Sequence, residues 1–156
     1  MADEQWDQQE SVEVDASPQH VWSLVSDVPR TGEWSPVCRR CEWLGDVAEP
    51  AVGSRFVGHN RRGPFRWSRE CVITASDPGE EFAFTTLFKG QESTHWRYRL
   101  EPTSSGTRVT ESYRAVSMPR WVWLANQVPG QARRSERDAR ENLQQSLARL
   151  KTLAEQ

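Results

Sequence analysis

The sequence predicts an α+β fold in which a curved antiparallel sheet of about seven strands wraps around a long C-terminal helix, with two short helices after the first strand. Three observations predict this fold. Apolar and polar residues alternate with a period of two through most of residues 41–116, and short turn motifs interrupt the alternation. A helical stripe of apolar residues fills residues 132–156. A broken helical pattern lies between the first strand and the others.

The N-terminal region is expected to contain the first strand and then the two short helices. Valine alternates with acidic residues through residues 11–16, as in a half-buried strand. Ser17 and Pro18 then supply an N-cap residue and a proline at the first helical position. The helical stripe that follows ends at Pro29, and residues 31–34 form at most one or two further turns.

Six further strands joined by short turns account for the period-two region. Phe82, Phe84, Thr86 and Phe88 fall on one side of the fourth of these strands. The expected ranges, in chain order, are residues 41–46, 53–62, 65–79 with a closing turn at 77–79, 81–88, 93–102 and 106–116.

The segment 117–131 has no clear helical or strand pattern, but it is rich in apolar side chains between two prolines. It contains Trp121, Trp123, Leu124 and Val128. This segment either gates a cavity, touches a membrane or partner protein, or packs closed over the core. In the long helix after it, one apolar stripe is formed by Ala139, Leu143, Leu147, Leu150 and Ala154.

The composition favours a protein whose interior is partly a lined cavity. The chain has 156 residues, of which only 36% are hydrophobic, yet it contains 8 Trp. Tryptophan is rarely buried completely and its N–H group needs a partner. Residues 1–9 are polar and are expected to be frayed, whereas residues 10–156 are expected to form one domain.

Charge and motif content exclude several classes of protein. The net charge of −2 lacks the basic excess of a general nucleic-acid binder, so no nucleic-acid partner is expected. No apolar run is long enough for a membrane span, so no integral membrane contact is expected. The acidic N-terminus has no apolar signal core and the 3 Cys are an odd number, which predicts a reduced, cytoplasmic protein. Whether it is a monomer or a homodimer stays open.

The chain resembles the START-like (SRPBCC, helix-grip) superfamily, in particular its bacterial polyketide cyclase/dehydrase-like branch. The resemblance rests on the "SVEVDASPQHVW" strand and helix start, the "SDVPRTGEWSP" helix pair, the "VGSRFVGHNRRGPFRWSRECVITASDPGEEFAF" strands, "WRYRLEPTSSGTRVTES" and the closing helix. It covers nearly all of the chain from Ser11 onward. It implies a helix-grip fold with a ligand cavity between sheet and helix, but it carries no catalytic signature.

Strand parity selects the side chains expected to line such a cavity. Trp34 is expected to act as a lid, and Ala139 and Leu143 to face the cavity from the helix. Ordinary core packing is the favoured interpretation for any one ring alone, but the mixture of aromatic rings, an inward glycine and a few polar groups is typical of ligand sites. The strand residues of this set are Phe56, Gly58, Asn60, Trp67, Arg69, Phe84, Trp96, Tyr98, Glu111 and Tyr113.

Glu111 is the candidate residue best suited to acid–base chemistry, and two roles are open for it. In a structural role, Arg69 or Asn60 holds the inward carboxylate in an internal ion pair or hydrogen bond. In a catalytic role, burial raises the pKa of the carboxyl group toward neutrality and Glu111 acts as a general base. Tyr98 or Tyr113 would then polarise a carbonyl oxygen of the ligand.

The function expected from these features is binding of a small hydrophobic molecule, such as a lipid, an isoprenoid or an aromatic polyketide, for carriage or sensing. The alternative is a polyketide cyclase, aromatase or dehydratase that acts on a ligand in the same cavity, so enzymatic activity is open. A third possibility is a partner-binding regulator that uses the surface around Trp121 and Trp123.

No cofactor or metal is expected. The "CRRC" motif at Cys38 and Cys41 lacks a second ligand pair for zinc, and it does not sit at the start of a helix as redox motifs of this type do. His20, His59 and His95 do not cluster and are expected at the surface. Motifs of nucleophilic hydrolases, zinc proteases and nucleotide-binding loops do not occur.

Overall fold

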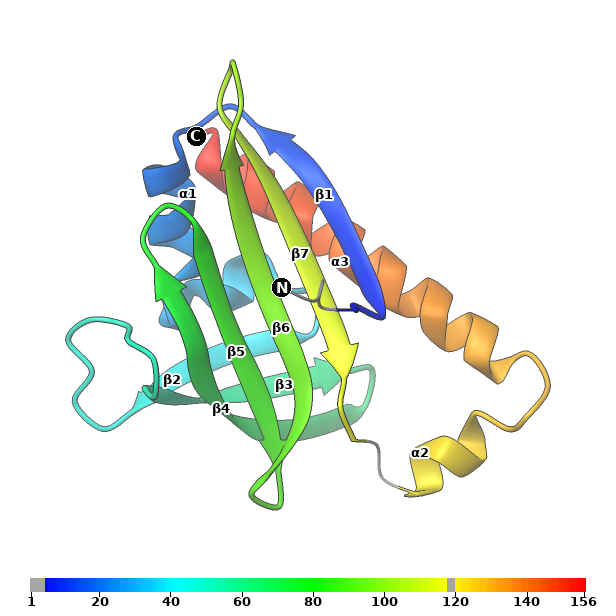
Figure 1. The fold of residues 1–156 in the computed structure, drawn as a ribbon. Coiled ribbons are helices and arrows are strands. Elements are labelled where there is room, and N and C mark those ends of the chain that lie inside the picture. The colour runs from blue at the N-terminus through cyan, green and yellow to red at the C-terminus, as the bar shows by residue number, and fades with distance from the viewer. Residues whose placement is uncertain (1–4, 118–119) are drawn as a thin grey trace.

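The computed structural model describes residues 5–117 and 120–156, and it has the predicted α+β architecture. A sheet of seven strands runs in the order β1-β7-β6-β5-β4-β3-β2, with every neighbouring pair antiparallel (Figure 1). The strands are β1 Gln8–Val14, β2 Cys38–Leu44, β3 Arg55–Arg62, β4 Phe65–Asp77, β5 Glu81–Phe88, β6 Gln91–Pro102 and β7 Thr107–Ala115.

The two helices expected after the first strand are the α-helix α1, Pro18–Val25, and the short 3-10 helix η1, Val28–Glu33. The start of α1 follows the predicted chemistry, because the Ser17 hydroxyl accepts a hydrogen bond from the backbone N–H of His20 at 3.2 Å. Two more helices follow the sheet, α2 at Arg120–Ala125 and α3 at Gln131–Ala154. In Figure 1 the sheet curves around α1 and part of α3.

We call the face of the sheet that packs against α1, η1 and α3 the concave face. There α1 contacts β5 and β6, η1 contacts β2, and α3 contacts mainly β1. The core between these elements is aliphatic and aromatic, and burial of each such side chain stabilises the fold by about 1.5–3 kcal/mol. Its most completely buried members include Val21, Val25, Val28, Trp34, Ile73, Phe82, Val109, Leu147 and Leu150.

An irregularity in β2 shapes one end of the concave face. The register between β2 and β3 shifts between Cys38 and Arg40, so Arg39 is the extra residue of a β-bulge. The helix η1 packs directly on this bulge, because a Cβ atom at Gly32 would overlap the Arg39 carbonyl oxygen. Only glycine allows this approach.

The N-terminal segment is more ordered than its polarity suggests. Of the stretch 1–9 that is expected to be frayed, residues 1–4 lie outside the described residues. The strand β1 already begins at Gln8, and the Asp7 backbone N–H donates to the Tyr113 carbonyl oxygen at 3.0 Å. Trp6 stacks on the guanidinium of Arg97, with 4.6 Å from the guanidinium carbon to the ring centroid. These contacts hold the segment from Trp6 onward against the sheet.

The helix α2 does not pack into the core. Its Trp121 is 70% exposed, and Trp123, Leu124 and Val128 are also exposed. Residues 118 and 119 of the expected segment 117–131 lie outside the described residues. Among the helices that the structure describes, none combines the length and apolar character needed to cross a membrane.

Candidate ligand site on the concave face

A row of aromatic rings crosses the middle of the concave face. Phe84, Trp96 and Tyr113 are direct cross-strand partners on β5, β6 and β7. The Phe84 and Trp96 rings stack with centroids 6.5 Å apart, and Trp96 and Tyr113 stack at 5.3 Å. Phe56 on β3 extends the row with an edge-on contact to Phe84 at 5.2 Å. Strand pairing therefore assembles the predicted aromatic residues into one continuous surface.

The aromatic row is only partly covered by helix. Phe84, Trp96 and Tyr113 are half-buried, whereas Phe82, Tyr98 and Leu100 further along the same strands are buried. The difference follows from α3, whose buried residues are Leu143, Ser146, Leu147, Leu150 and Ala154. The helix thus closes the concave face only from Leu143 onward, and its first turns leave the aromatic row accessible.

The first turns of α3 nevertheless lie close to this row. Burial raises the pKa of Tyr113, and the negative charges of Asp7 and of Glu136 on α3 add to the shift. On the other side, Arg62 at the end of β3 reaches α3, where its Nη2 lies 3.2 Å from Oδ2 of Asp138. This ion pair joins the end of β3 to the first half of α3.

A buried polar cluster lies next to the aromatic row, two positions further along β6 and β7. The Trp34 indole Nε1–H donates to the Tyr98 hydroxyl at 3.2 Å, and the Tyr98 hydroxyl donates to Oε1 of Glu111 at 3.0 Å. Tyr98 and Glu111 are cross-strand partners on β6 and β7. The second carboxylate oxygen, Oε2 of Glu111, is buried and has no hydrogen-bond partner among residues 5–117 and 120–156.

The protonation of this cluster is set mainly by burial. Burial raises the pKa of Glu111 to about 7, and the hydrogen bond from Tyr98 and the nearby Ser146 hydroxyl oppose the shift without cancelling it. Burial, followed by the negative charge of Glu111, raises the pKa of Tyr98 well above its ordinary value, so the phenol keeps its proton. Glu111 is therefore the group of this cluster that changes charge near neutral pH.

The partner of Glu111 differs from the one expected. The sequence predicts Arg69 or Asn60 as the partner, whereas the structure places the Tyr98 hydroxyl there. Arg69 lies near the far end of β4, where its guanidinium stacks 4.8 Å from the Phe88 ring centroid and its Nη1 donates to the Ser68 carbonyl oxygen. The arginine side chain finds its partners at the C-terminal end of β5 and on its own strand, not at Glu111.

The remaining candidates occupy different depths of the same face. Trp34, expected as a lid, is 1% exposed and forms part of the inner wall. Asn60 and Trp67 are half-buried cross-strand partners on β3 and β4. Gly58 is buried, and Ala139 and Leu143 on α3 are half-buried and buried, respectively.

The histidines and acidic groups do not form a further centre. His20 is exposed, whereas His59 and His95 are half-buried rather than fully at the surface. His59 Nδ1 lies 2.8 Å from the Ser68 hydroxyl, and His95 Nε2 lies 3.3 Å from Glu92. Within the part of the chain that the structure describes, no group of three or more His, Cys, Asp or Glu residues is arranged to hold a metal ion.

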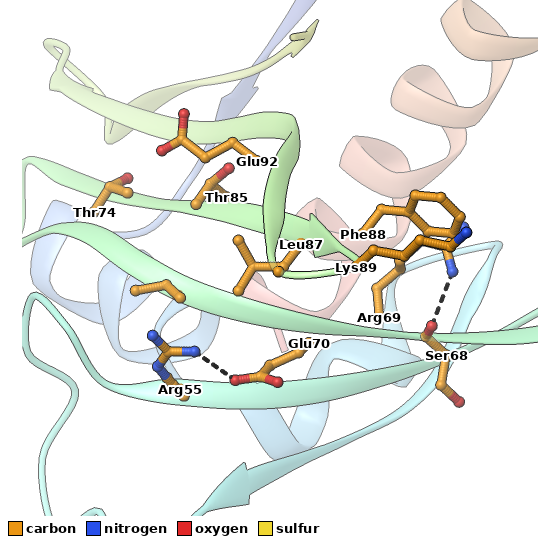
Figure 2. A pocket seen from close by; sticks show the side chains of 12 residues that line it. Arg55, Ser68, Arg69, Glu70, Thr74, Thr85, Leu87, Phe88, Lys89 and Glu92 are labelled. Atoms are coloured by element: carbon orange, nitrogen blue, oxygen red, sulfur yellow. Dashed lines mark hydrogen bonds and ion pairs between the residues drawn. The ribbon is translucent and has the colours of Figure 1, made fainter. Parts of the chain in front are cut away.

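A hollow that the sequence analysis does not predict lies on the opposite, convex face of the sheet (Figure 2). It has a volume of about 480 Å³ over β3, β4 and β5 and the turn after β5. Small residues such as Thr74 and Thr85 form its floor, and the Arg55–Glu70 ion pair of 2.7 Å forms one rim. Outward-facing small residues between long charged ones are the sequence signal for such a hollow.

Comparison with known proteins connects this fold to one family. The model of the family described as "Polyketide cyclase / dehydrase and lipid transport" matches residues 5–155. Among curated proteins, none matches the chain.

Solved structures with the same fold include proteins with and without a stated activity. The Polyketide_cyc-like protein Cgl2372 from Corynebacterium glutamicum is 26% identical, with a TM-score of 0.59 over 96% of this chain and 88% of its own. The di-domain aromatase/cyclase StfQ of the steffimycin biosynthetic pathway is 16% identical, with a TM-score of 0.75 over 95% of this chain and 50% of its own.

A third similar structure is the Zhui aromatase/cyclase from Streptomyces sp. R1128. It is 16% identical, with a TM-score of 0.63 over 95% of this chain and 92% of its own. At these identities the aromatase/cyclases share the fold, as the resemblance to START-like proteins implied. Because the family model spans nearly the whole sequence, the protein belongs to the polyketide cyclase/dehydrase and lipid transport family.

Proposed function

We propose that the protein binds one small, mostly apolar molecule on the aromatic row of the concave face, for carriage or sensing. The observation that carries the proposal is the half-burial of Phe84, Trp96 and Tyr113, three stacked rings in the middle of a face that is otherwise closed by helices. Rings left accessible inside a curved sheet favour a flat or elongated apolar partner. Lipids, isoprenoids and aromatic polyketides have this shape and chemistry.

The buried polar cluster adds a second requirement on the ligand. Oε2 of Glu111 is a buried acceptor with no partner among the described residues, and such an atom is costly unless a proton, a water molecule or a ligand satisfies it. A hydroxyl group at one end of an apolar ligand would donate to this oxygen. We therefore favour a ligand that combines an apolar or aromatic body with one hydroxyl group.

The comparisons support a ligand of this class without naming it. The description of the family covers both cyclase or dehydrase activity and lipid transport, and two of the similar structures are titled aromatase/cyclase. Each of these roles needs a cavity for a mostly apolar molecule. We regard carriage or sensing as the first candidate because it requires only the cavity.

Native mass spectrometry of the freshly purified protein tests the proposal directly. We expect an additional bound mass that disappears on denaturation. A second measurement uses the fluorescent probe 1-anilinonaphthalene-8-sulfonate, with Trp96→Ala as the test variant and Arg99→Ala, an exposed position on the same strand, as the matched control.

We expect the Trp96→Ala variant to bind the probe about tenfold more weakly, because a stacked ring contributes on the order of 1 kcal/mol beyond its buried area. Arg99→Ala should bind like the parent protein. Trp96→Phe keeps a ring in place and should recover most of the affinity. Equal probe affinity in Trp96→Ala and the parent, with no co-purified mass, would exclude the aromatic row as the binding site.

A second candidate function is cyclisation or dehydration of a polyketide-like ligand, and the buried Glu111 favours it. With a pKa of about 7, its carboxylate could remove a proton from a carbon next to a carbonyl group. The resulting enolate would form a carbon–carbon bond to a second carbonyl carbon of the same ligand, and the new alkoxide would regain a proton from Glu111. Tyr98 would have to turn its O–H from Glu111 to the ligand carbonyl.

The variant Glu111→Gln separates the two candidates. It keeps the size of the side chain but removes the base. Loss of ligand conversion with unchanged probe binding supports the enzyme, whereas unchanged conversion removes Glu111 from any catalytic role. Circular dichroism of the variant checks that the fold is retained.

A further inference from the structure

The two thiols of β2 lie on the same side of the sheet, although regular strand geometry would separate them. Residues three apart on a regular strand point to opposite faces. The extra residue of the bulge, Arg39, shifts the alternation by one position and brings both cysteines to the same face. Cys38 pairs with Asn60 and Cys41 pairs with Gly58, two positions on one face of β3. As a result the two Sγ atoms lie 3.1 Å apart.

Two glycines make room for this thiol pair. Gly58 lies opposite both sulfurs, and a Cβ atom at that position would be in ordinary van der Waals contact with each Sγ, at 3.7 Å, so only a side chain larger than that of alanine would press on the thiols. Gly32 allows η1 to press on the carbonyl of the bulge residue Arg39. The bulge and the space in front of it are therefore fixed by residues from three separate elements.

The two thiols are chemically unequal. The hydrogen bond between them lowers the pKa of Cys38 and raises the pKa of Cys41. Cys38 is half-buried, whereas Cys41 is 4% exposed. The third cysteine, Cys71, is buried, and burial raises its pKa to about 12. Only the thiolate is an effective nucleophile, so Cys38 is the cysteine suited to react first.

We propose that Cys38 and Cys41 form a reversible redox site that hydrogen peroxide converts to an intramolecular disulfide. In the first step the Cys38 thiolate attacks one peroxide oxygen, the O–O bond breaks, and hydroxide leaves and is protonated to water. Cys38 is now a sulfenic acid. In the second step the Cys41 sulfur attacks the Cys38 sulfur, the S–O bond breaks, and the leaving hydroxide takes the Cys41 proton to form a second water molecule.

The geometry supports closure of this disulfide with little movement. A disulfide needs the two sulfurs about 1 Å closer than they lie in the reduced protein, and the bulge has already turned both side chains toward each other. Reduction by a dithiol reverses the bond by thiol–disulfide exchange. The proposal does not depend on the ligand, because it concerns β2 and its neighbours alone.

Mass spectrometry of the purified, reduced full-length protein after peroxide treatment tests the proposal. Trypsin cuts after Arg39 and Arg40, between the two cysteines, so the disulfide joins peptide 31–39 to peptide 41–55. We expect this linked pair to replace the separate peptides, the intact mass to fall by two hydrogen atoms, and dithiothreitol to restore both. A protein that instead gains oxygen atoms without the link, or links either cysteine to Cys71, contradicts the proposal.

Single variants assign the two roles. Cys71→Ser should form the linked pair as the parent protein does. Cys41→Ser leaves the sulfenic acid on Cys38 unresolved, so dimedone should label Cys38. Should Cys41→Ser fail to fold, Cys38→Ser provides the second test, because it should lose both the link and all dimedone labelling. Labelling of Cys41 in Cys38→Ser at the rate seen for Cys38 would overturn the assignment of Cys38 as the first to react.

Discussion

Tyr98 donates a hydrogen bond of 3.0 Å to Glu111 inside the closed part of the concave face, where Glu111 is 4% exposed. The pair is a direct consequence of the register between β6 and β7, which sets the two residues opposite each other. A carboxylate buried with one hydrogen-bonded oxygen and one free oxygen is a source of instability when it is charged. This relationship makes the stability of the protein depend on pH.

The first prediction concerns that pH dependence. The pKa of Glu111 is about 7 in the folded protein and 4.5 as an ordinary carboxyl group, so the folded state holds its proton more tightly. Protonated Glu111 therefore favours the folded state most below pH 4.5. This stabilisation is progressively lost as the pH rises through 7, where the folded protein must bury a charged carboxylate. Relative to the parent protein, Glu111→Gln should gain about 2 kcal/mol in unfolding free energy between pH 5 and pH 8.

Urea unfolding of both proteins at the two pH values measures this gain. Any fixed cost of the buried glutamine amide cancels, because it is the same at both pH values. Glu101→Gln, which removes an exposed carboxylate from β6, is the control and should show no comparable gain. A pH-independent difference between Glu111→Gln and the parent would mean that Glu111 is not buried as a charge.

The second prediction concerns the hydroxyl of Tyr98. Tyr98→Phe removes the donor to Glu111 and the acceptor of the Trp34 indole, leaving both groups without these partners. We expect a loss of about 1–3 kcal/mol in unfolding free energy, measured by urea denaturation at pH 8. Tyr113→Phe, a half-buried position of the aromatic row, should lose clearly less. Equal losses in the two variants would count against the buried cluster.

The third prediction concerns the ion pair between the end of β3 and α3. The Arg62–Asp138 pair is exposed on both sides, so Arg62→Ala should change the unfolding free energy by at most about 1 kcal/mol. It should nevertheless accelerate dissociation of 1-anilinonaphthalene-8-sulfonate in stopped-flow measurements, because the pair joins β3 to α3. Arg108→Ala, which breaks the similar exposed pair with Glu13 on β1, is the control. Unchanged dissociation in Arg62→Ala would show that the ligand does not pass between β3 and α3.

The fourth prediction uses one substitution at two leucines. Leu150 on α3 is completely buried, whereas Leu124 on α2 is 60% exposed. Leu150→Ala should cost about 2–5 kcal/mol in unfolding free energy through lost burial and a cavity. Leu124→Ala should stay within about 0.5 kcal/mol of the parent protein. A large loss in Leu124→Ala would indicate that α2 packs against the core in solution.

Much of this architecture could be predicted from the sequence, because it follows from local chemistry. Alternation along residues 106–116 defines β7 within one residue, and Ser17 with Pro18 defines the start of α1. The apolar stripe of α3 likewise identifies the face that packs on the sheet. These patterns depend only on side chains a few positions apart, so they can be recognised in the sequence without any knowledge of the tertiary structure.

The features that differ from the sequence prediction depend on how separate strands lie relative to one another. The Cys38–Cys41 contact requires a bulge that regular strand parity does not contain. Strand parity alone does not show that the long side chain of Arg69 reaches the Phe88 ring at the end of β5, and not Glu111. Tyr98 as the partner of Glu111 depends on the register of the β6–β7 hairpin, which parity alone does not fix. Each of these needs the relative position of two strands.

The partial contact between α3 and the sheet has a consequence for how the family diversifies. The fully buried residues of α3 begin at Leu143, so most side chains of positions 131–142 are exposed and make only surface ion pairs with the sheet. Substitutions there reshape the rim of the site at little cost in folding free energy. Under the proposed function, this one stretch is therefore where substitutions are expected to alter ligand preference while the sheet and the second half of the helix keep their architecture.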